Sequence, residues 1–339
     1  MRKFLLFIVL TFTCVMRLAA QESDLPRFRV RTNLVTVPVS VFDEHGNLLE
    51  GLKKEDFRLW EDQAPQEIRG FGTDEDFMSV VLVLDTSPTS KSELSKIKNA
   101  AEIFAQTLQP RDRISLITFD DRVSLILDWT SDKKKVKKAL GKITLGVRTA
   151  LYDAMYLAAS EQLQGVNGRK AIILLTDCLN NESRVGFGDA VRAIVQSQAA
   201  FYVVSKTAMV KEDARMQRRV VILNDIYRRL FGEESNRVDE YFMEKEKEMW
   251  NLAVETGGRC FFPTNYDAIP RIYTEIAREL KNKYYLTYVS NQTLQPDSWH
   301  HIAVECLRPV SEIIYRNGYY YLPKTSSKIF KPSLVRGSL

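Results

Sequence analysis

Apolar residues along the chain repeat with two different periods, and the changes of period divide the sequence into three stretches. In the first stretch, residues 27–76, apolar and polar residues alternate from Val35 to Val41, which is the period of a half-buried strand. Pro38 lies within this strand and predicts an edge position or a bulge, because proline cannot donate a ladder hydrogen bond. Shorter strands are expected at 57–60 and 67–71.

From Phe77 the pattern changes to apolar strands that alternate with amphipathic helices. Val80–Leu84 and Ile172–Thr176 are almost wholly apolar, which is typical of strands covered on both faces. Strand and helix in alternation predict an α/β domain with a doubly wound, mostly parallel sheet of Rossmann-like type. Further strands are expected at 114–119, 201–204 and 260–262, a hairpin partner at 122–127, and helices near 91–108, 132–141, 149–164, 187–198 and 266–282.

Residues 207–256 lengthen the connection before the last strand of this domain with two helical segments. Met216 and Leu223 belong to a near-helical apolar pattern, and arginines occupy many of the other positions. We expect a solvated charged helix face here, and a partner-binding surface is the alternative, because the insertion starts at the carboxyl end of a strand.

Strands return after residue 282, beginning with Tyr284–Val289. Neither this stretch nor the first can easily build a core alone, so we expect the two to pair into one β-sandwich into which the α/β domain is inserted. The expected parts are a signal peptide at 1–20, an N-terminal β segment at 27–76, the α/β domain at 77–282, a C-terminal β segment at 283–323 and a polar, fraying tail at 324–339.

The first twenty residues have the pattern of a secretory signal. Arg2 and Lys3 give a positive start, and the apolar run Phe4–Val15 is too short to span a bilayer. Small residues precede Gln21, where cleavage is expected. A retained anchor is the alternative, which Arg17 disfavours. The pattern predicts an exported protein, periplasmic or secreted, with no membrane span after signal cleavage.

The net charge and the cysteine content of the chain bear on two classes of function, nucleic-acid binding and zinc binding. The net charge of +5 is small for 339 residues and is interspersed, which argues against nucleic acid as a partner. Signal cleavage would leave Cys178, Cys260 and Cys306, an odd number. A bridge between Cys260 and Cys306 and three buried free thiols both stay open. No Cys-x-x-Cys occurs, so no zinc pattern is present.

Oxygen-bearing side chains follow two of the apolar strands. The first strand ends in Asp85, with Ser87 and Thr89 at alternate positions after it, and Asp177 follows the second. Thr149 opens a helical stretch between them. Carboxylates and hydroxyls are the hard ligands that Mg²⁺ prefers, and ligands in open α/β sheets bind beyond the carboxyl ends of strands. A turn that only caps the next helix is the alternative for the first loop.

These residues resemble the metal-ion-dependent adhesion site of von Willebrand factor type A domains, whose pattern is Asp-x-Ser-x-Ser, then a distant Thr and a distant Asp. The resemblance implies that Asp85, Ser87, Thr89, Thr149 and Asp177 bind Mg²⁺ or Mn²⁺. In that family the metal keeps one coordination position open for a carboxylate from a partner. The resemblance therefore implies a protein-binding or adhesion module that is not an enzyme, with a protein partner that exposes an Asp or Glu.

The chain departs from the family pattern in the loops around this site. Thr89 replaces the usual second Ser, Pro88 and Cys178 stand where Gly is common, and Val147-Arg148 replace a frequent Gly-Gly. A cation at Arg148 would oppose metal binding unless it points away or contacts the incoming ligand. In the second case Arg148 would give the acidic partner group a second contact.

The whole layout, with Gly51–Phe57, Glu61-Asp62 and Arg316–Tyr319, resembles an exported acidobacterial family of proteins related to these domains. Two other functions remain open. One is a structural envelope protein with a degenerate, metal-free site. The other is a phosphatase that uses Asp85 as nucleophile, which would need a second Asp where Ser87 stands. No Ser-His-Asp set is expected, because all three histidines fall in the β segments.

Overall fold

The computed structural model describes residues 34–72, 77–87, 91–146, 148–212, 237–292, 295, 298–321 and 335–336. The expected signal peptide, most of the tail and the predicted ligand Thr89 lie outside these residues. Met216, Leu223 and the arginines between residues 213 and 236 also lie outside them. The insertion is helical where it is described, in α6 (Thr207–Glu212) and α8 (Arg237–Glu255).

One sheet forms the centre of the α/β part, with seven strands among the described residues in the order β10-β9-β8-β5-β6-β7-β15. Neighbouring pairs among β9, β8, β5 and β6 are parallel, and β7 closes a hairpin with β6 as the sequence predicts. The chain moves from β5 towards β6 and β7 and then returns to the other side of β5 at β8. Their bounds are β5 Met78–Asp85, β6 Arg113–Phe119, β7 Val123–Thr130, β8 Arg169–Thr176, β9 Ala200–Ser205, β10 Cys260–Phe261 and β15 Val335–Arg336.

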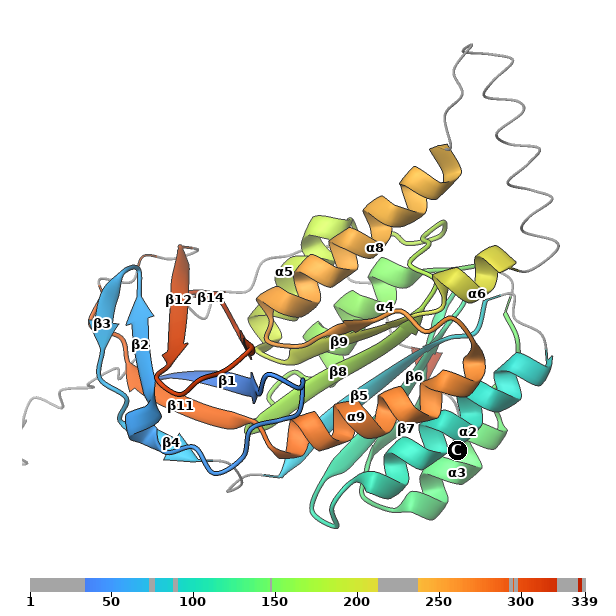
Figure 1. Cartoon of the computed structure of the whole chain (residues 1–339). Helices are drawn as coiled ribbons and strands as arrows, with labels where there is room; N and C mark the ends of the chain where they lie inside the picture. The colour runs from blue at the N-terminus through green and yellow to red at the C-terminus, as the bar shows by residue number, and fades with distance from the viewer. Residues whose placement is uncertain are drawn as a thin grey trace, which may run out of the picture. The chain divides into compact units, whose positions relative to one another are not determined.

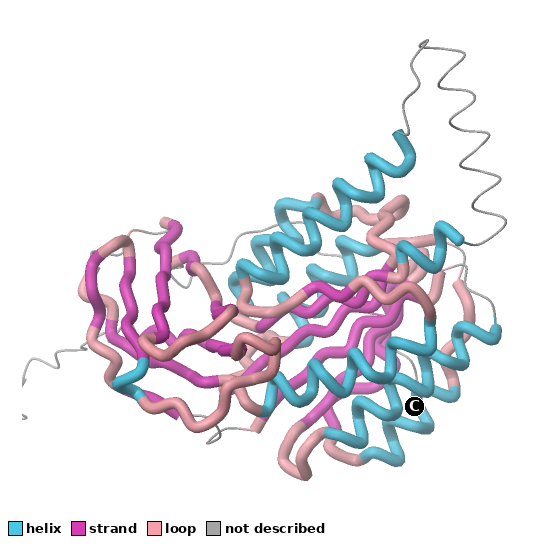
Figure 2. The backbone as a smooth tube through the Cα atoms, in the orientation of Figure 1, coloured by secondary structure: helices cyan, strands magenta, loops and turns pink. Residues whose placement is uncertain are grey.

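Helices cover both faces of this sheet (Figure 1; Figure 2). Every residue of β5 is buried, and its side chains alternate between two cores, with Leu82 in one and Val83 in the other. The mostly parallel, doubly wound sheet predicted from the apolar strands is thereby confirmed. The first core contains α2 (Lys91–Thr107), α3 (Lys133–Gly141) and α9 (Ile269–Lys281), and the second contains α4 (Leu151–Leu157), the π-helix Ala158–Gln162, α5 (Phe187–Ser197) and α8.

Two antiparallel four-stranded sheets, β13-β1-β11-β4 and β14-β12-β2-β3, are built from both ends of the described chain. β1 pairs with β11 and β2 pairs with β12, so the N-terminal and C-terminal segments share a β-sandwich around an inserted α/β part, as expected. The exact domain boundaries stay a prediction. The bounds are β1 Leu34–Phe42, β2 Phe57–Glu61, β3 Ala64–Gln66, β4 Gly70–Gly72, β11 Tyr284–Val289, β12 Trp299–Cys306, β13 Glu312–Tyr315 and β14 Gly318–Tyr320.

Pro38 does not place its strand at an edge, which corrects the sequence prediction. β1 lies between β11 and β13 in its sheet. Its pairing with β13 runs only from Val39 to Phe42, so Pro38 lies beyond the last paired position on that side. A proline is tolerated there because no ladder hydrogen bond to β13 is required. The polar tail differs from expectation too, since β15 pairs with β7 in parallel.

A buried ion pair connects the α/β part to the sandwich. Lys283, just before β11, and Glu279 of α9 have fully buried side chains, with Nζ and Oε1 2.9 Å apart. Lys283 Nζ also donates to Ser40 Oγ of β1 at 2.6 Å and to Gly257 O at 2.8 Å. Ser40 Oγ in turn donates to Glu279 Oε1 at 3.0 Å. Side chains from both parts of the fold therefore satisfy one another inside a single polar network.

Removal of one member of this pair should destabilise the protein far more than removal of both. Burial alone raises the pKa of Glu279, but the Lys283 charge and hydrogen bonds from Lys283 and Tyr202 outweigh it, so that the pKa is lowered. Lys283→Met leaves that carboxylate buried with the more distant Arg259, whose Nη1 lies 3.4 Å from Glu279 Oε2, as its cation, and should cost about 3 kcal/mol. Urea unfolding should show that the double variant Glu279→Gln/Lys283→Met recovers much of this loss. The coupling would be contradicted if the stability losses of Glu279→Gln and of Lys283→Met, each measured alone, simply added up in the double variant.

Candidate metal centre

Two carboxylates lie at the carboxyl edge of the parallel sheet, on neighbouring strands. Asp85 is the last residue of β5, and Asp177 directly follows β8. The two strands are paired up to Leu84 and Leu175, so both acids extend beyond the same edge. They are 1% and 6% exposed. This is the position where the strand order reverses, the usual place for a ligand in such a sheet.

The loops after these strands hold one oxygen of each carboxylate in place. The backbone N–H of Ser87 donates to Asp85 Oδ1 at 2.8 Å, and that of Leu179 donates to Asp177 Oδ1 at 3.0 Å. Both contacts span two residues, which is the Asx-turn geometry that short acidic side chains favour. The orientation of each acid is therefore set by its own loop before any ligand arrives.

A third loop, before α4, is hydrogen-bonded to the other two. The backbone N–H of Thr149 donates to Asn181 Oδ1 at 2.9 Å, and the backbone N–H of Asn181 donates to Thr149 O at 3.0 Å. Gly146 N–H donates to the carbonyl of Thr86 at 2.7 Å. The buried Thr149 is thereby held at the same edge of the sheet as the two acids.

The predicted ligands thus come from three connected loops. Asp85, Ser87, Thr149 and Asp177 are all buried and are carried by loops that are bonded to one another or follow adjacent strands. Their donor atoms are hard carboxylate and hydroxyl oxygens, a set that suits Mg²⁺ or Mn²⁺. Thr89 lies outside the described residues, and its role stays a prediction.

Lys206, which the sequence reasoning missed, lies among these residues. Its side chain is fully buried, and its Nζ is 3.2 Å from Asp85 Oδ2. Burial lowers the pKa of Lys206, but the charges of Asp85 and Asp177 outweigh this and raise it overall. The available signal was a lysine directly after the wholly buried strand β9. A cation at that strand end indicates a buried anion beside it.

One ammonium does not fully compensate two carboxylates. Burial and then the negative charge of Asp85 raise the pKa of Asp177 to about 6, although Lys206 acts in the opposite direction. With both acids ionised, the cluster of Asp85, Asp177 and Lys206 carries a net negative charge. A further positive charge at this edge would relieve that repulsion, so the electrostatics of the donor set fit a bound cation.

Arg148 lies beside the site on the surface. Its guanidinium forms an ion pair with the carboxylate of Glu182, and its side chain is 63% exposed. Glu182 belongs to the loop after β8, and its backbone N–H donates to Thr149 O at 3.2 Å. The positive charge is thus compensated by a neighbouring acid, and an exposed guanidinium is still available to an incoming group.

Cys178 occupies a left-handed backbone conformation, with φ of 64°. A residue with a Cβ is strained there, which explains why glycine suits this position in the related pattern. The thiol is 1% exposed and lies 3.9 Å from Ser205 Oγ. Cys178, Cys260 and Cys306 are all free thiols in the structure, so the possible bridge between Cys260 and Cys306 is not formed.

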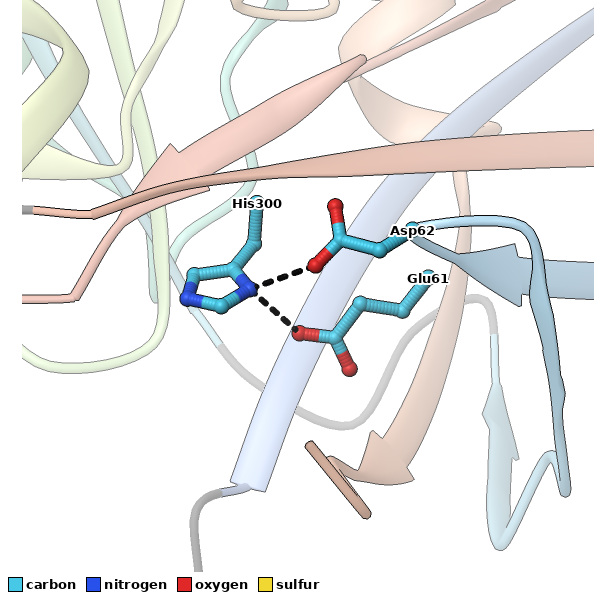
Figure 3. Close-up of side chains that lie close together, drawn as sticks. All are labelled: Glu61, Asp62 and His300. Carbon is cyan, nitrogen blue, oxygen red and sulfur yellow. Dashed lines mark hydrogen bonds and ion pairs between the residues drawn. The ribbon is translucent and has the colours of Figure 1, made fainter. Parts of the chain in front are cut away.

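A second group of ligand-type side chains lies in the β-sandwich. Glu61, Asp62 and His300 place ligand atoms within 4.8 Å of one another (Figure 3). His300 Nδ1 is 2.7 Å from Asp62 Oδ2 and 3.6 Å from Glu61 Oε1. Tyr319 OH donates to Glu61 Oε1 at 2.6 Å.

Hydrogen bonds connect this second group to Ser298. Ser298 Oγ donates to the carbonyl of Gln295 at 2.6 Å and lies 2.7 Å from His300 Nε2. His300 Nδ1 faces Asp62 Oδ2, so each ring nitrogen of His300 has a hydrogen-bond partner in the β-sandwich. The structure therefore assembles a Ser-His-Asp row that was not predicted from the sequence.

Comparison with known proteins agrees with the geometry of the sheet edge. Residues 80–180 match the family model for the von Willebrand factor type A domain. The matched residues include Asp85, at the end of β5, and Asp177, directly after β8. No curated protein matches it significantly.

Several solved structures resemble the fold at low identity. Proximal thread matrix protein 1 from the mussel byssus, with a zinc-occupied metal-ion-dependent adhesion site, is 15% identical with a TM-score of 0.47, covering 66% of this chain and 50% of that one. This chain thus spans about half of that protein. A von Willebrand factor type A protein from Catenulispora acidiphila is 9% identical with a TM-score of 0.43, and the match covers 85% of this chain and 72% of that one. An aerotolerance-related membrane protein from Bacteroides fragilis is 20% identical with a TM-score of 0.40, and the match covers 60% of this chain and 99% of that one.

Within the part of the chain that the structure describes, no helix combines the length and the apolar character needed to cross a membrane.

Substitutions at Cys178 should separate backbone strain from side-chain burial. Cys178→Gly relieves the positive φ but loses a buried thiol, two effects of about 1 kcal/mol each and of opposite sign. We expect its unfolding free energy to stay within about 1 kcal/mol of wild type. Cys178→Val, β-branched at positive φ, should lose about 2 kcal/mol or more. Thermal or urea unfolding of both variants measures this, and equal stability of the two would contradict it.

Proposed function

We propose that the protein is an exported, metal-dependent protein-binding module. The observation that carries this proposal is the pair of buried carboxylates at the strand-order reversal, Asp85 and Asp177, which share the single ammonium of Lys206. In the proposed site, these acids and the hydroxyls of Ser87, Thr89 and Thr149 hold Mg²⁺ or Mn²⁺. When bound, the metal supplies an electrophilic position for an external carboxylate.

The residues of the chain itself would prepare this recognition. The Asx turns orient Asp85 and Asp177, and the hydrogen bonds between Thr149 and Asn181 hold the loop before α4 against the loop after β8. Arg148, exposed at the rim, would give the same acidic group a second, charge-assisted contact after exchange with Glu182. The proposed partner is a protein that displays an exposed Asp or Glu.

A specific observation favours a second candidate function. The buried Lys206 already places a cation 3.2 Å from Asp85, as a degenerate, metal-free site in a structural envelope protein would require. Neither of these two candidate functions is an enzymatic activity. A phosphatase would need a general acid two residues after Asp85, where Ser87 stands.

The same proposal includes export from the cytoplasm and membership of a family of exported proteins. The basic start and short apolar run at the N-terminus support a signal peptide and a periplasmic or secreted location. The β-sandwich around an inserted α/β part supports membership of the exported acidobacterial family that the sequence resembles.

Loss of either carboxylate should abolish the proposed metal site without unfolding the protein. Asp85→Asn and Asp177→Asn each remove an anionic ligand, so Mg²⁺ and Mn²⁺ binding measured by calorimetry should weaken by at least about 100-fold. The wild-type melting temperature should rise in millimolar Mg²⁺, and the variants should show no rise. Asp267→Asn is the matched control, because that exposed carboxylate pairs only with Lys96 among the described residues. Absence of any metal effect on wild type would favour the metal-free candidate.

Partner binding should depend on the metal and on Arg148. Protein immobilised in Mg²⁺ should retain a partner from envelope extract, release it in EDTA and bind it again when Mg²⁺ is restored. Arg148→Ala should weaken this retention about tenfold, as expected for the loss of one charge-assisted contact, while metal affinity stays equal or improves. Retention that persists in EDTA and in Asp85→Asn would show that recognition lies elsewhere on the chain.

A further inference from the structure

Lys206 is the most unusual residue of the metal centre, because lysine is almost never fully buried unless it is paired. None of its side chain is exposed, and the side chain of Asp85, its ion-pair partner at 3.2 Å, is equally buried. Burial of an ammonium costs several kcal/mol, which an adjacent buried carboxylate offsets. The stability of this edge of the sheet therefore depends on the pair.

The backbone holds Lys206 at this position from both sides. Its N–H donates to the carbonyl of Thr176, the last residue of β8, at 2.7 Å. The next residue, Thr207, donates from Oγ1 to the carbonyl of Asp177 at 3.1 Å and lies 2.8 Å from Ser205 Oγ. Lys206 is thus attached to the loop that carries Asp177, and only its side chain can change position without breaking these contacts.

The charges that face Lys206 come from three elements. Asp85 follows β5 and Asp177 follows β8, and both favour the charged ammonium. Tyr266 approaches from the short helix Tyr266–Ala268, and its pKa is raised to about 12 by burial against the opposing effect of Lys206. Tyr266 is therefore neutral at physiological pH, and the negative charges of Asp85 and Asp177 face the lysine.

A divalent ion and this ammonium compete for the same oxygen atom. Mg²⁺ binds carboxylate oxygen at about 2.1 Å. With Lys206 Nζ 3.2 Å from Asp85 Oδ2, a metal on that oxygen would lie within a few ångströms of another cation in a buried site. Repulsion between like charges at such a distance amounts to several kcal/mol even with partial screening.

We propose that Lys206 is the resident counter-cation of the site, and that a divalent ion enters only by displacing its ammonium from Asp85. This inference rests on the proposed function, since it concerns how the same site is loaded. The metal-free protein is then a stable resting state in which Lys206 compensates part of the charge of the two acids. Metal binding by the wild-type protein is weak, because each binding event must also separate a buried ion pair.

The test compares Lys206→Met with wild type by calorimetric titration with Mg²⁺ and Mn²⁺. Methionine keeps the length of the side chain and removes the charge, so both metals should bind at least about tenfold more tightly. The melting temperature without metal should fall, because Asp85 loses its cation. Lys211→Met is the matched control. That lysine lies five positions further on and pairs with Asp239, at 3.2 Å, outside the site.

A second measurement needs no substitution and remains available if Lys206→Met does not fold. A buried ammonium paired with a carboxylate exchanges its protons slowly, so the ¹⁵N-labelled wild-type protein should show a lysine ammonium signal without metal. Saturating Mg²⁺ should shift or remove this signal. Asp85→Asn should also remove it, which assigns it to the pair.

The outcomes separate this inference from the proposed function. Tighter binding by Lys206→Met, with wild-type affinity for Lys211→Met, supports both. Equal metal affinity of Lys206→Met and wild type, or an ammonium signal unchanged at saturating Mg²⁺, leaves the metal-dependent function intact and overturns the role of Lys206. Absence of binding by wild type and by a folded Lys206→Met overturns the metal site itself, and the displacement with it.

Discussion

The electrostatic repulsion between two buried carboxylates is the constraint around which the carboxyl edge of the sheet is organised. Asp85 and Asp177 lie on neighbouring strands that are covered on both faces, so water cannot screen them. Each acid has one oxygen bonded by its own loop, and Lys206 neutralises part of the remaining charge. This edge therefore keeps an excess of negative charge, and in the proposal made above the balance between an internal ammonium and an external metal decides the state of the site.

A second buried ion pair lies near the amino ends of the strands, where it joins the α/β part to the sandwich. Glu279 and Lys283 pair with each other, Arg259 adds a second cation at 3.4 Å from Glu279, and Ser40 of the sandwich is hydrogen-bonded to both members of the pair. Arg169, the first residue of β8, donates to Tyr285 OH of β11 at 3.1 Å, which places the sandwich against the amino ends of the strands. One edge of the sheet is therefore closed by the sandwich, and the edge with Asp85 and Asp177 is left for a ligand.

Most elements of the fold could be predicted because their signals are local. The apolar run of β5 and the alternation of β1 follow directly from burial on two faces or on one. Asp85 and Asp177 were recognisable because strand ends in a parallel sheet meet at one edge. Lys206, the row of Ser298, His300 and Asp62, and the interior place of Pro38 were missed, since each depends on partners that are distant in sequence.

The sequence by itself determined the order of strands and helices, the two-part layout and the acids and hydroxyls that reach the sheet edge. These features depend on the period of apolar residues and on side-chain chemistry, which a linear chain displays. Tertiary structure alone decided the electrostatics. It placed a lysine 121 positions after Asp85 against its carboxylate and left Cys178 at positive φ beside the site. Charge compensation depends on distance and burial, and both exist only after the chain has folded.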